Sequence, residues 1–233
     1  MPEQAPYERG CVIVPAYQEA RRIAAVVRRI REFMADVVVI DDGSTDATAR
    51  EAEAAGAVVL RHGVNRGKGL ALHTGFTYAR EQGFDYVITM DGDGQHDAAD
   101  LPRFVEAYQR TGTPVLVGSR MSDVQSMPWI RRLTNRFMSW LLSREMSQAV
   151  PDTQCGYRLF RCQVLPEVAA QSPRFAAESE LLLHLSRRGV PIGAVPVATI
   201  YRDEKSKINP FRDTVRFFGM LRRFRREHPR QSS

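Results

Sequence analysis

The sequence has few cysteines and no long apolar run, and both shortages narrow the class of protein. Three cysteines among 233 residues cannot all pair, and their spacing matches no zinc-binding pattern. We therefore interpret them as reduced structural thiols. No stretch approaches the roughly 18 to 20 uninterrupted apolar residues that span a bilayer, and residues 1–4 lack the basic and apolar regions of a signal peptide. These absences favour a cytoplasmic protein.

Two familiar phosphate-binding signatures are also missing. The segment Asn65-Arg66-Gly67-Lys68-Gly69 is similar to a P-loop, but it lacks the G-x-x-x-x-G-K-[ST] spacing and has a glycine where the P-loop has a hydroxyl side chain. No G-x-G-x-x-G follows the first expected strand. The first absence excludes the kinase and NTPase classes, and the second disfavours nicotinamide binding.

The apolar content and the placement of charge indicate one domain with a basic tail. With 43% apolar residues, 233 residues can bury one substantial core. The net charge is +6, and residues 201–233 hold ten Lys and Arg against four Asp and Glu, which leaves residues 1–200 neutral. We expect a domain over residues 1–200 and a basic amphipathic tail over residues 201–233.

Short apolar runs alternate with segments of helical spacing or composition. The runs lie at residues 11–14, 37–40, 57–60, 86–90 and 115–117. This alternation predicts an α/β fold with a mainly parallel sheet and helices on both of its faces. In such folds ligands bind at the carboxyl ends of the strands.

The most informative polar cluster follows the apolar run at residues 86–90. Asp91 and Asp93 are separated by one glycine, and Gln95 adds an amide oxygen at the same edge. Such oxygens suit Mg²⁺ or Mn²⁺, which proteins commonly share with substrate phosphates. An isolated Asp-Gly pair is more often a turn, but four acidic residues lie between positions 91 and 100. The cluster therefore predicts a metal site that awaits a diphosphate.

Polar clusters also follow the first three expected strands, and we expect them to bind a nucleotide. The candidate residues are Pro15, Ala16, Tyr17, Glu19, Asp42, Arg66 and Lys68. The tyrosine ring and the hydrogen-bonding side chains around it would hold a base, and the aspartate would accept a hydrogen bond from a base N–H. The two basic residues would face phosphates.

Seven motifs occur in one order from residue 11 to residue 218. They are VIVPAYQEA, VVVIDDGSTDAT, NRGKGLAL, DGDGQHD, GSR at 118–120, DTQCGYRLF at 152–160 and EKSKINPFRDTVRFF at 204–218. Together they resemble the inverting nucleotide-sugar transferases of glycosyltransferase family 2, in the branch of the dolichyl-phosphate mannose and dolichyl-phosphate glucose synthases. The Gln-x-x-Arg-Trp signature of the family's processive polysaccharide synthases is absent.

The resemblance implies a GT-A type, Rossmann-like fold and a metal-dependent transfer of a hexose from a nucleotide sugar to polyprenyl or dolichyl phosphate. It implies that Asp91 faces the donor ribose and the metal, that Asp93 binds the metal at the diphosphate, and that Gln95 assists. The metal would be Mg²⁺ or Mn²⁺ and would offset charge on the departing nucleoside diphosphate. The motif at 152–160 favours UDP-glucose over GDP-mannose as donor.

The identity of the acceptor decides which further residues act. A hydroxyl of a glycolipid or polysaccharide precursor would need a carboxylate base, for which Glu178 and Glu180 are candidates. A lipid phosphate needs cations instead. The cations that the resemblance implies are Arg120, Arg131 or Arg132, Arg202 and Lys207. A non-catalytic nucleotide-sugar-binding scaffold is a third alternative.

Two amphipathic segments bear on membrane attachment. Residues 128–142 mix both tryptophans with arginines, which is typical of an interfacial helix and equally of a core helix that caps the active site. In the tail, one side is lined by Phe211, Val215, Phe218 and either Leu221 or Arg222, with basic residues largely off it. This pattern predicts peripheral attachment to the cytoplasmic face of a membrane. It leaves open whether a membrane partner protein presents the lipid, and the aromatic residues among the basic ones disfavour nucleic-acid binding.

Overall fold

Seven strands form one mixed sheet in the computed structural model, which describes residues 8–122, 129–165, 175–198 and 210–227. The strands are β1 (Gly10–Ala16), β2 (Val37–Asp41), β3 (Val58–Arg61), β4 (Tyr86–Thr89), β5 (Val115–Ser119), β6 (Arg158–Arg161) and β7 (Ile192–Pro196). Their order across the sheet is β3-β2-β1-β4-β6-β5-β7. Only the two pairs that contain β6 are antiparallel. The predicted α/β class with a mainly parallel sheet is confirmed.

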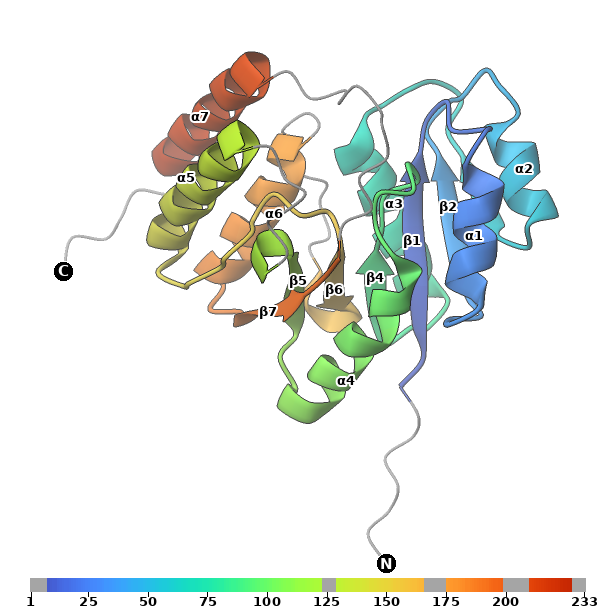
Figure 1. Cartoon of the computed structure of the whole chain (residues 1–233), viewed down its shortest axis with the longest axis horizontal. Coiled ribbons are helices and arrows are strands. Elements are labelled where there is room, and N and C mark those ends of the chain that lie inside the picture. Colours follow the sequence, from blue (N-terminus) through green and yellow to red (C-terminus); the bar gives the residue numbers. More distant parts are fainter. Residues whose placement is uncertain (1–7, 123–128, 166–174, 199–209, 228–233) are drawn as a thin grey trace, which may run out of the picture.

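Helices cover the sheet and form a separate layer at one side. They are α1 (Ile23–Arg31), α2 (Thr48–Ala54), α3 (Lys68–Glu81), α4 (Leu101–Thr111), α5 (Trp129–Met146), α6 (Phe175–Arg187) and α7 (Pro210–Glu227), with short 3₁₀ turns η1 (Ala98–Asp100), η2 (Arg120–Ser122) and η3 (Cys162–Val164). Figure 1 shows α1 and α4 in front of the sheet, α3 behind it, and α5, α6 and α7 grouped beyond the strands β5 and β7.

Close packing of α3 on the sheet fixes where that helix begins. A Cβ atom on Gly75 would lie 2.6 Å from Cγ2 of Ile13 in β1, so only a glycine lets α3 approach this strand so closely. Because α3 follows β3, its first residue, Lys68, lies at the edge formed by the carboxyl ends of the parallel strands. The tight helix–strand contact therefore sets the position of Lys68 at that edge.

The antiparallel strand β6 brings a distant segment to the same edge. Thr89, the last residue of β4, pairs with Arg158, the first residue of β6. The residues just before β6 therefore lie beside the residues just after β4. The hydroxyl of Thr89 donates to the carbonyl of Gly156 at 2.9 Å and fixes this juxtaposition.

All three cysteines are buried and free. Burial raises the pKa of Cys155 to about 12 and that of Cys162 to about 11, so both thiols stay protonated at neutral pH. They pack as small apolar side chains, as the interpretation of structural thiols expects.

The basic tail forms a packed helix. Phe217, Met220, Leu221 and Phe224 of α7 are buried, and α7 contacts α6. Arg225 donates to Glu145 at 2.8 Å and joins α7 to α5. Val215 and Phe218, on the side that the sequence pattern assigned to a membrane, remain exposed, whereas Leu221 is buried.

Two neighbouring phenylalanines of α7 test whether this helix is part of the folded core. Phe217 is 2% exposed and Phe218 is 44% exposed. We expect Phe217→Ala to lower the free energy of unfolding by about 3 to 5 kcal/mol, because it removes a buried ring and leaves a cavity. Phe218→Ala, the matched control, should change it by less than about 0.5 kcal/mol. Urea denaturation of the two variants measures the difference, and equal values would mean that α7 is not docked.

Candidate functional site

The predicted acidic loop lies at the carboxyl edge of the sheet, against the segment that precedes β6. Lys68 Nζ lies 2.5 Å from Asp91 Oδ1 and 3.0 Å from Glu178 Oε2. The lysine begins α3, the aspartate follows β4 and the glutamate lies on α6. The fold thus brings together three residues that the sequence only suggested separately.

Gly156 gives this cluster the room that it needs. A Cβ atom at this position would lie 2.9 Å from Asp91 Oδ2, 3.1 Å from Lys68 Nζ and 3.2 Å from Glu178 Oε1. Its carbonyl is already held by Thr89. A larger residue would therefore push on all three charged groups at once.

The charges of the cluster shift one another's pKa values. Burial raises the pKa of Asp91, but the Lys68 ammonium and the His96 ring outweigh burial and hold that pKa well below its usual range. Burial lowers the pKa of Lys68, but Asp91 and Glu178 outweigh it and raise that pKa above its usual value. Burial and the nearby Asp91 raise the pKa of Asp93. At neutral pH the site therefore keeps Lys68 positive and Asp91 negative.

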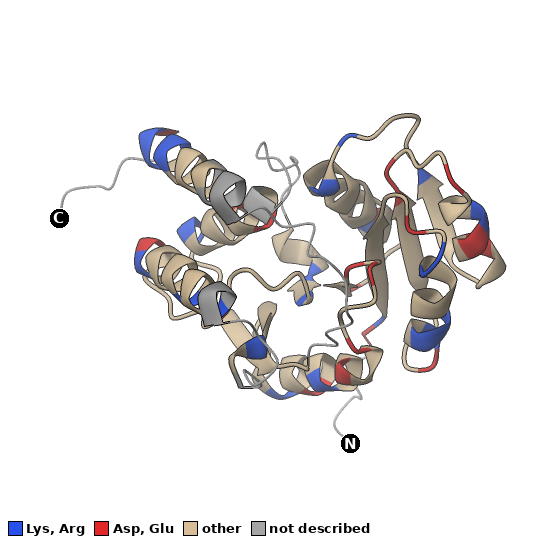
Figure 2. Ribbon diagram, turned by 45° about the horizontal axis from the view of Figure 1, so that its top comes forward, with Lys and Arg blue, Asp and Glu red and all other residues tan. Residues whose placement is uncertain are grey.

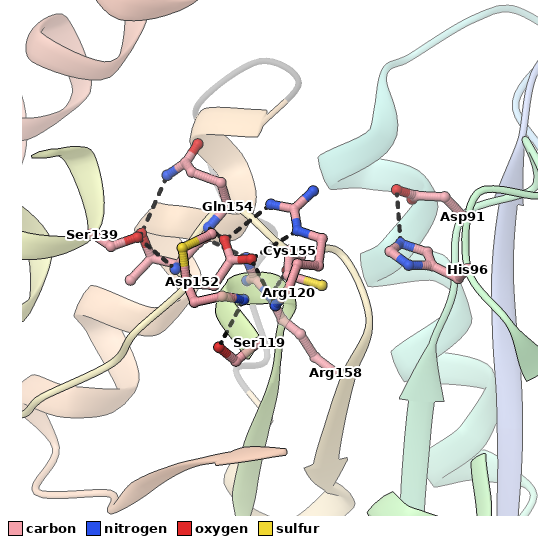
Figure 3. A network of polar contacts seen from close by, with 11 residues as sticks. Asp91, His96, Ser119, Arg120, Ser139, Asp152, Gln154, Cys155 and Arg158 are labelled. Carbon is pink, nitrogen blue, oxygen red and sulfur yellow. Dashed lines mark hydrogen bonds and ion pairs between the residues drawn. The ribbon is translucent and has the colours of Figure 1, made fainter. Parts of the chain in front are cut away.

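His96 supports Asp91 from the side opposite to Lys68. Its Nε2 lies 3.6 Å from Asp91 Oδ2, as Figure 3 shows. The ring is buried and packs against Tyr157, with the ring centroids 5.1 Å apart. Each carboxylate oxygen of Asp91 thus has its own cationic or hydrogen-bonding neighbour.

The oxygen atoms of the site fit a divalent cation that is shared with a ligand. Asp91 and Asp93 lie on one loop, and the backbone N–H of Gln95 donates to Asp93 Oδ1 at 3.0 Å. Oε1 of Glu178 is buried and has no hydrogen-bond partner among the described residues. No three His, Cys, Asp or Glu residues of that part of the chain form a complete cage. Hard oxygen donors in an incomplete set suit a cation that takes further ligands from a phosphate.

Asp42 anchors the loop that leads into α3. Its carboxylate accepts hydrogen bonds from the backbone N–H groups of Arg66 at 2.9 Å and Gly67 at 2.7 Å, and it lies 2.7 Å from Nδ1 of His62. The Arg66 side chain is exposed. Asp42 therefore positions the residues before Lys68, a task that the sequence did not indicate, and its contact with a base stays a prediction.

The segment after β1 offers an exposed ring beside this loop. Pro15 and Ala16 end the strand, and Tyr17 is 46% exposed. Glu19 lies in the segment before α1, where Arg22, the residue that precedes this helix, donates to its carboxylate at 3.1 Å. Of this predicted base-binding group, Tyr17 has the surface that a base could stack on.

Two arginines organise the other half of the site. Arg120 donates to both oxygens of the buried Asp152, at 2.7 Å from Nε and 2.9 Å from Nη2, so the guanidinium is held in one orientation (Figure 3). Arg158 is 1% exposed and donates to three carbonyl groups. These belong to Cys155 at 2.7 Å, Glu178 at 2.7 Å and Thr153 at 2.8 Å. Arg158 thereby ties the segment before β6 to the helix that carries Glu178.

The two candidate glutamates face opposite ways. Glu178 faces Lys68, whereas Glu180 lies 3.3 Å from Arg223 on α7 and 3.8 Å from His184. The structure therefore brings Glu178 and not Glu180 to the acidic loop. The side chain of Arg131, together with Arg202 and Lys207, lies outside the described residues.

Four residues of the site carried no assigned role in the sequence analysis: His96, Asp152, Gly156 and Arg158. All four lie in motifs that the resemblance used, DGDGQHD and DTQCGYRLF. Their roles depend on β6 running antiparallel beside β4, and the sequence pattern did not give that direction. The one available signal was Arg158, a charged residue inside the run Tyr157-Arg158-Leu159-Phe160.

Comparison with solved structures places the fold in the GT-A class of α/β transferases. Glucosyl-3-phosphoglycerate synthase from Mycobacterium tuberculosis, solved with Mn²⁺ and UDP-glucose, matches with a TM-score of 0.73 at 20% identity, over 97% of this chain and 81% of that chain. This likeness confirms the predicted fold.

The chain belongs to glycosyltransferase family 2. The family model described as Glycosyl transferase family 2 matches residues 11–169. The undecaprenyl-phosphate mannosyltransferase of Micrococcus luteus is 30% identical over 209 residues, 84% of this chain and 85% of that protein. A UDP-N-acetylglucosamine–dolichyl-phosphate N-acetylglucosaminyltransferase of Methanococcus voltae is 29% identical over 215 residues, 82% of this chain and 86% of that protein. The predicted family and enzyme class are confirmed.

Replacement of Gly156 tests the convergence of the three charged groups. We expect Gly156→Ala to lower the rate of sugar transfer by at least about tenfold, because its methyl group displaces Asp91, Lys68 and Glu178, and a shift of about 1 Å in a site can cost about a hundredfold. The fold should persist, since the atoms that must move are side-chain ends. Transfer kinetics and thermal unfolding measure the two effects.

Gly219→Ala is the matched control for this variant. A Cβ atom at this exposed position of α7 meets no atom within 4 Å among the described residues. Its transfer rate should equal that of the unmodified chain. Equal rates for both variants would contradict the crowding at Gly156.

Proposed function

We propose that this enzyme transfers a hexose from a nucleotide sugar to a polyprenyl phosphate, with inversion at the anomeric carbon and with Mg²⁺ or Mn²⁺. The convergence of Asp91, Lys68 and Glu178 beside Asp93 is the observation that supports a diphosphate site here. The two relatives with polyprenyl-phosphate and dolichyl-phosphate acceptors, each matched over more than four fifths of both chains, support the acceptor class.

The donor half of the mechanism uses the edge formed by β1, β2 and β4. Asp91 and Asp93, with Gln95 beside them, would hold the cation at the donor diphosphate, where it would supply Lewis-acid stabilisation of the leaving group. Lys68 and Arg66 would add positive charge along the phosphates. Tyr17 would stack on the base and Asp42 would accept from it. The motif at 152–160 favours UDP-glucose over GDP-mannose.

The acceptor half uses cations to position an anion. A lipid phosphate already carries the negative oxygen that attacks the anomeric carbon, so it needs orientation more than a base. Arg120, held by Asp152, presents a guanidinium of fixed orientation, and such groups bind phosphate bidentately. We propose that this set is completed by Arg131 or Arg132, together with Arg202 and Lys207.

A hydroxyl acceptor is the alternative within the same enzyme class. It would use Glu178 as the base, because this residue faces the acidic loop, whereas Glu180 is paired on α7. The carboxylate of Glu178 already contacts the Lys68 ammonium, 3.0 Å from its Oε2, so it is engaged by a cation instead of facing an acceptor hydroxyl. This contact favours the phosphate acceptor over the hydroxyl.

Exposed apolar residues support attachment to a membrane surface. Leu133, Phe137 and Trp140 lie along one side of α5, and α7 exposes Val215 and Phe218. Figure 2 shows basic residues along these helices, and cations beside exposed aromatic rings suit an anionic lipid surface. No helix in the described part of the chain is long and apolar enough to cross a membrane. We propose peripheral attachment at the cytoplasmic face, with or without a partner protein that presents the lipid.

Removal of Asp93 tests the assigned chemistry. We expect Asp93→Ala to reduce transfer by at least about a thousandfold, since it deletes a proposed ligand of the cation that stabilises the leaving group. The assay follows radiolabelled sugar from UDP- and GDP-sugars into a short-chain polyprenyl phosphate with Mn²⁺. A mild-acid-labile lipid product identifies the acceptor. The control is Asp36→Ala, which removes only an exposed pair with Arg9 at 3.2 Å and should keep full activity.

Two other results of this assay would redirect the proposal. Donor hydrolysis that needs Mn²⁺ but yields no labelled lipid would favour the hydroxyl acceptor and Glu178. Binding of nucleotide sugar without hydrolysis or transfer would favour the scaffold alternative.

Acidic substitutions on the exposed face of α5 test the proposed membrane contact. We expect the double variant Phe137→Glu with Trp140→Glu to lower binding to phosphatidylglycerol-containing vesicles by at least about tenfold, because acidic groups replace rings that enter the headgroup region. Vesicle flotation measures the bound fraction. Val58→Glu, at an exposed position of the edge strand β3, is the control. Unchanged binding by the double variant would remove α5 from the interface.

A further inference from the structure

The Lys68 ammonium lies where Asp91 would present an oxygen to a cation. Its Nζ is 2.5 Å from Asp91 Oδ1 and 3.0 Å from Glu178 Oε2, and it bridges two carboxylates that come from different elements. The other oxygen of Asp91 is near His96. Both oxygens of the first acidic residue therefore have neighbours already.

The Lys68 ammonium places a positive charge among the acidic side chains of the site. Asp93 lies two residues after Asp91, and Oε1 of Glu178 is buried with no hydrogen-bond partner among the described residues. A buried carboxylate oxygen without a partner is costly, so this position suits a ligand that can complete it. On one side the cluster lies against Gly156, which has no side chain to come between the charged groups. A divalent ion at Asp91 Oδ1 would therefore lie next to the ammonium in its present place.

We infer that Lys68 occupies the position of the divalent cation at Asp91 until a nucleotide diphosphate binds, so that the cation and the nucleotide enter the site together. This inference rests on the proposed function, because it takes the acidic loop as the cation site. A divalent ion beside the bound ammonium would be repelled at a few ångströms, and the negative diphosphate removes that repulsion by attracting both. The flexible four-carbon stem of lysine lets the ammonium turn from Asp91 to the phosphates.

Lys68, which was predicted to face phosphates, would thereby also decide when the site binds a divalent cation. Without the lysine, the negative charge of Asp91 and Asp93 should attract a divalent ion more strongly in the absence of substrate. With Lys68 in place, the cation should bind tightly only when the diphosphate supplies ligands and draws the ammonium away. Lys68 is thus a positioning residue for the cation as well as a group that faces the donor.

The test measures Mn²⁺ binding to the full chain by isothermal titration calorimetry, with and without UDP or GDP. In the unmodified chain, Mn²⁺ alone should bind weakly and the nucleotide should tighten it at least about tenfold. Lys68→Met should tighten the binding of Mn²⁺ alone by at least about tenfold, since it removes a unit charge from the site. The effect of the nucleotide on Mn²⁺ affinity should shrink in that variant. Lys68→Arg should keep the unmodified behaviour.

Two controls separate a local effect from net charge and from misfolding. Arg50→Met removes one positive charge from an exposed position of α2, and it should leave Mn²⁺ affinity unchanged. The double variant Lys68→Met with Glu178→Gln keeps the net charge and avoids unpaired acids, so it remains foldable if Lys68→Met does not. It should also bind Mn²⁺ alone more tightly than the unmodified chain.

The possible failures are distinct. If the nucleotide tightens Mn²⁺ binding in the unmodified chain, but both Lys68→Met variants bind Mn²⁺ alone no better than it does, the inference about Lys68 is wrong. If no variant binds Mn²⁺ with UDP or GDP, the assignment of the acidic loop as a cation site fails, and the proposed function fails with it.

Discussion

The buried guanidinium of Arg158 holds together the parts of the chain that form the site. It has no carboxylate partner among the described residues, and its charge is offset by the carbonyl groups of Thr153, Cys155 and Glu178. Burial of a charge is expensive unless the group is well bonded, so these carbonyls must stay in place for the fold to keep it. Because one of them belongs to α6 and two to the segment before β6, those elements move as one body. The positions of Asp152, Gly156 and Glu178 all follow from this constraint.

An ionic contact between Lys68 and Glu178 joins that body to the part of the sheet that holds the acidic loop. Lys68 belongs to the half made of β1 to β4, and Glu178 belongs to the half that contains β5 to β7 and the helices α5 to α7. Their contact closes the edge of the sheet at Asp91, and Thr89 with Gly156 fixes the backbone beneath it. A donor that neutralised or moved Lys68 would therefore act on the junction between the two halves. Donor binding and acceptor positioning are in this sense linked by the geometry of a few residues.

The sequence predicted the parallel strands and the place of the acidic loop, because each has a local signal. Ile23, Val26, Val27 and Ile30 of α1 recur at helical spacing, and all four are buried. The strand β6 was not among the expected strands, and a four-residue segment carries no signal of the direction in which it pairs. The choice between Glu178 and Glu180 was also out of reach. Residues two apart point about 200° from each other on a helix, and only the packing of α6 against α3 and α7 decides which of them faces the site.

The sequence was equally unable to predict the surroundings of α7. A pattern of aromatic and basic residues predicts an amphipathic helix, but it does not say whether the apolar face meets protein or lipid. Here Phe217 packs inward and Phe218 points out, so one helix serves both the core and the exposed face.

On α5, Phe137 and Trp140 are exposed while Ser139 between them is buried and accepts a hydrogen bond from the N–H of Thr153 at 2.9 Å. Thr153 is adjacent to Asp152, which holds Arg120. Only these few contacts separate the exposed rings from the guanidinium proposed to bind the acceptor. A membrane bound at this face would therefore set the depth at which the acceptor phosphate meets the site.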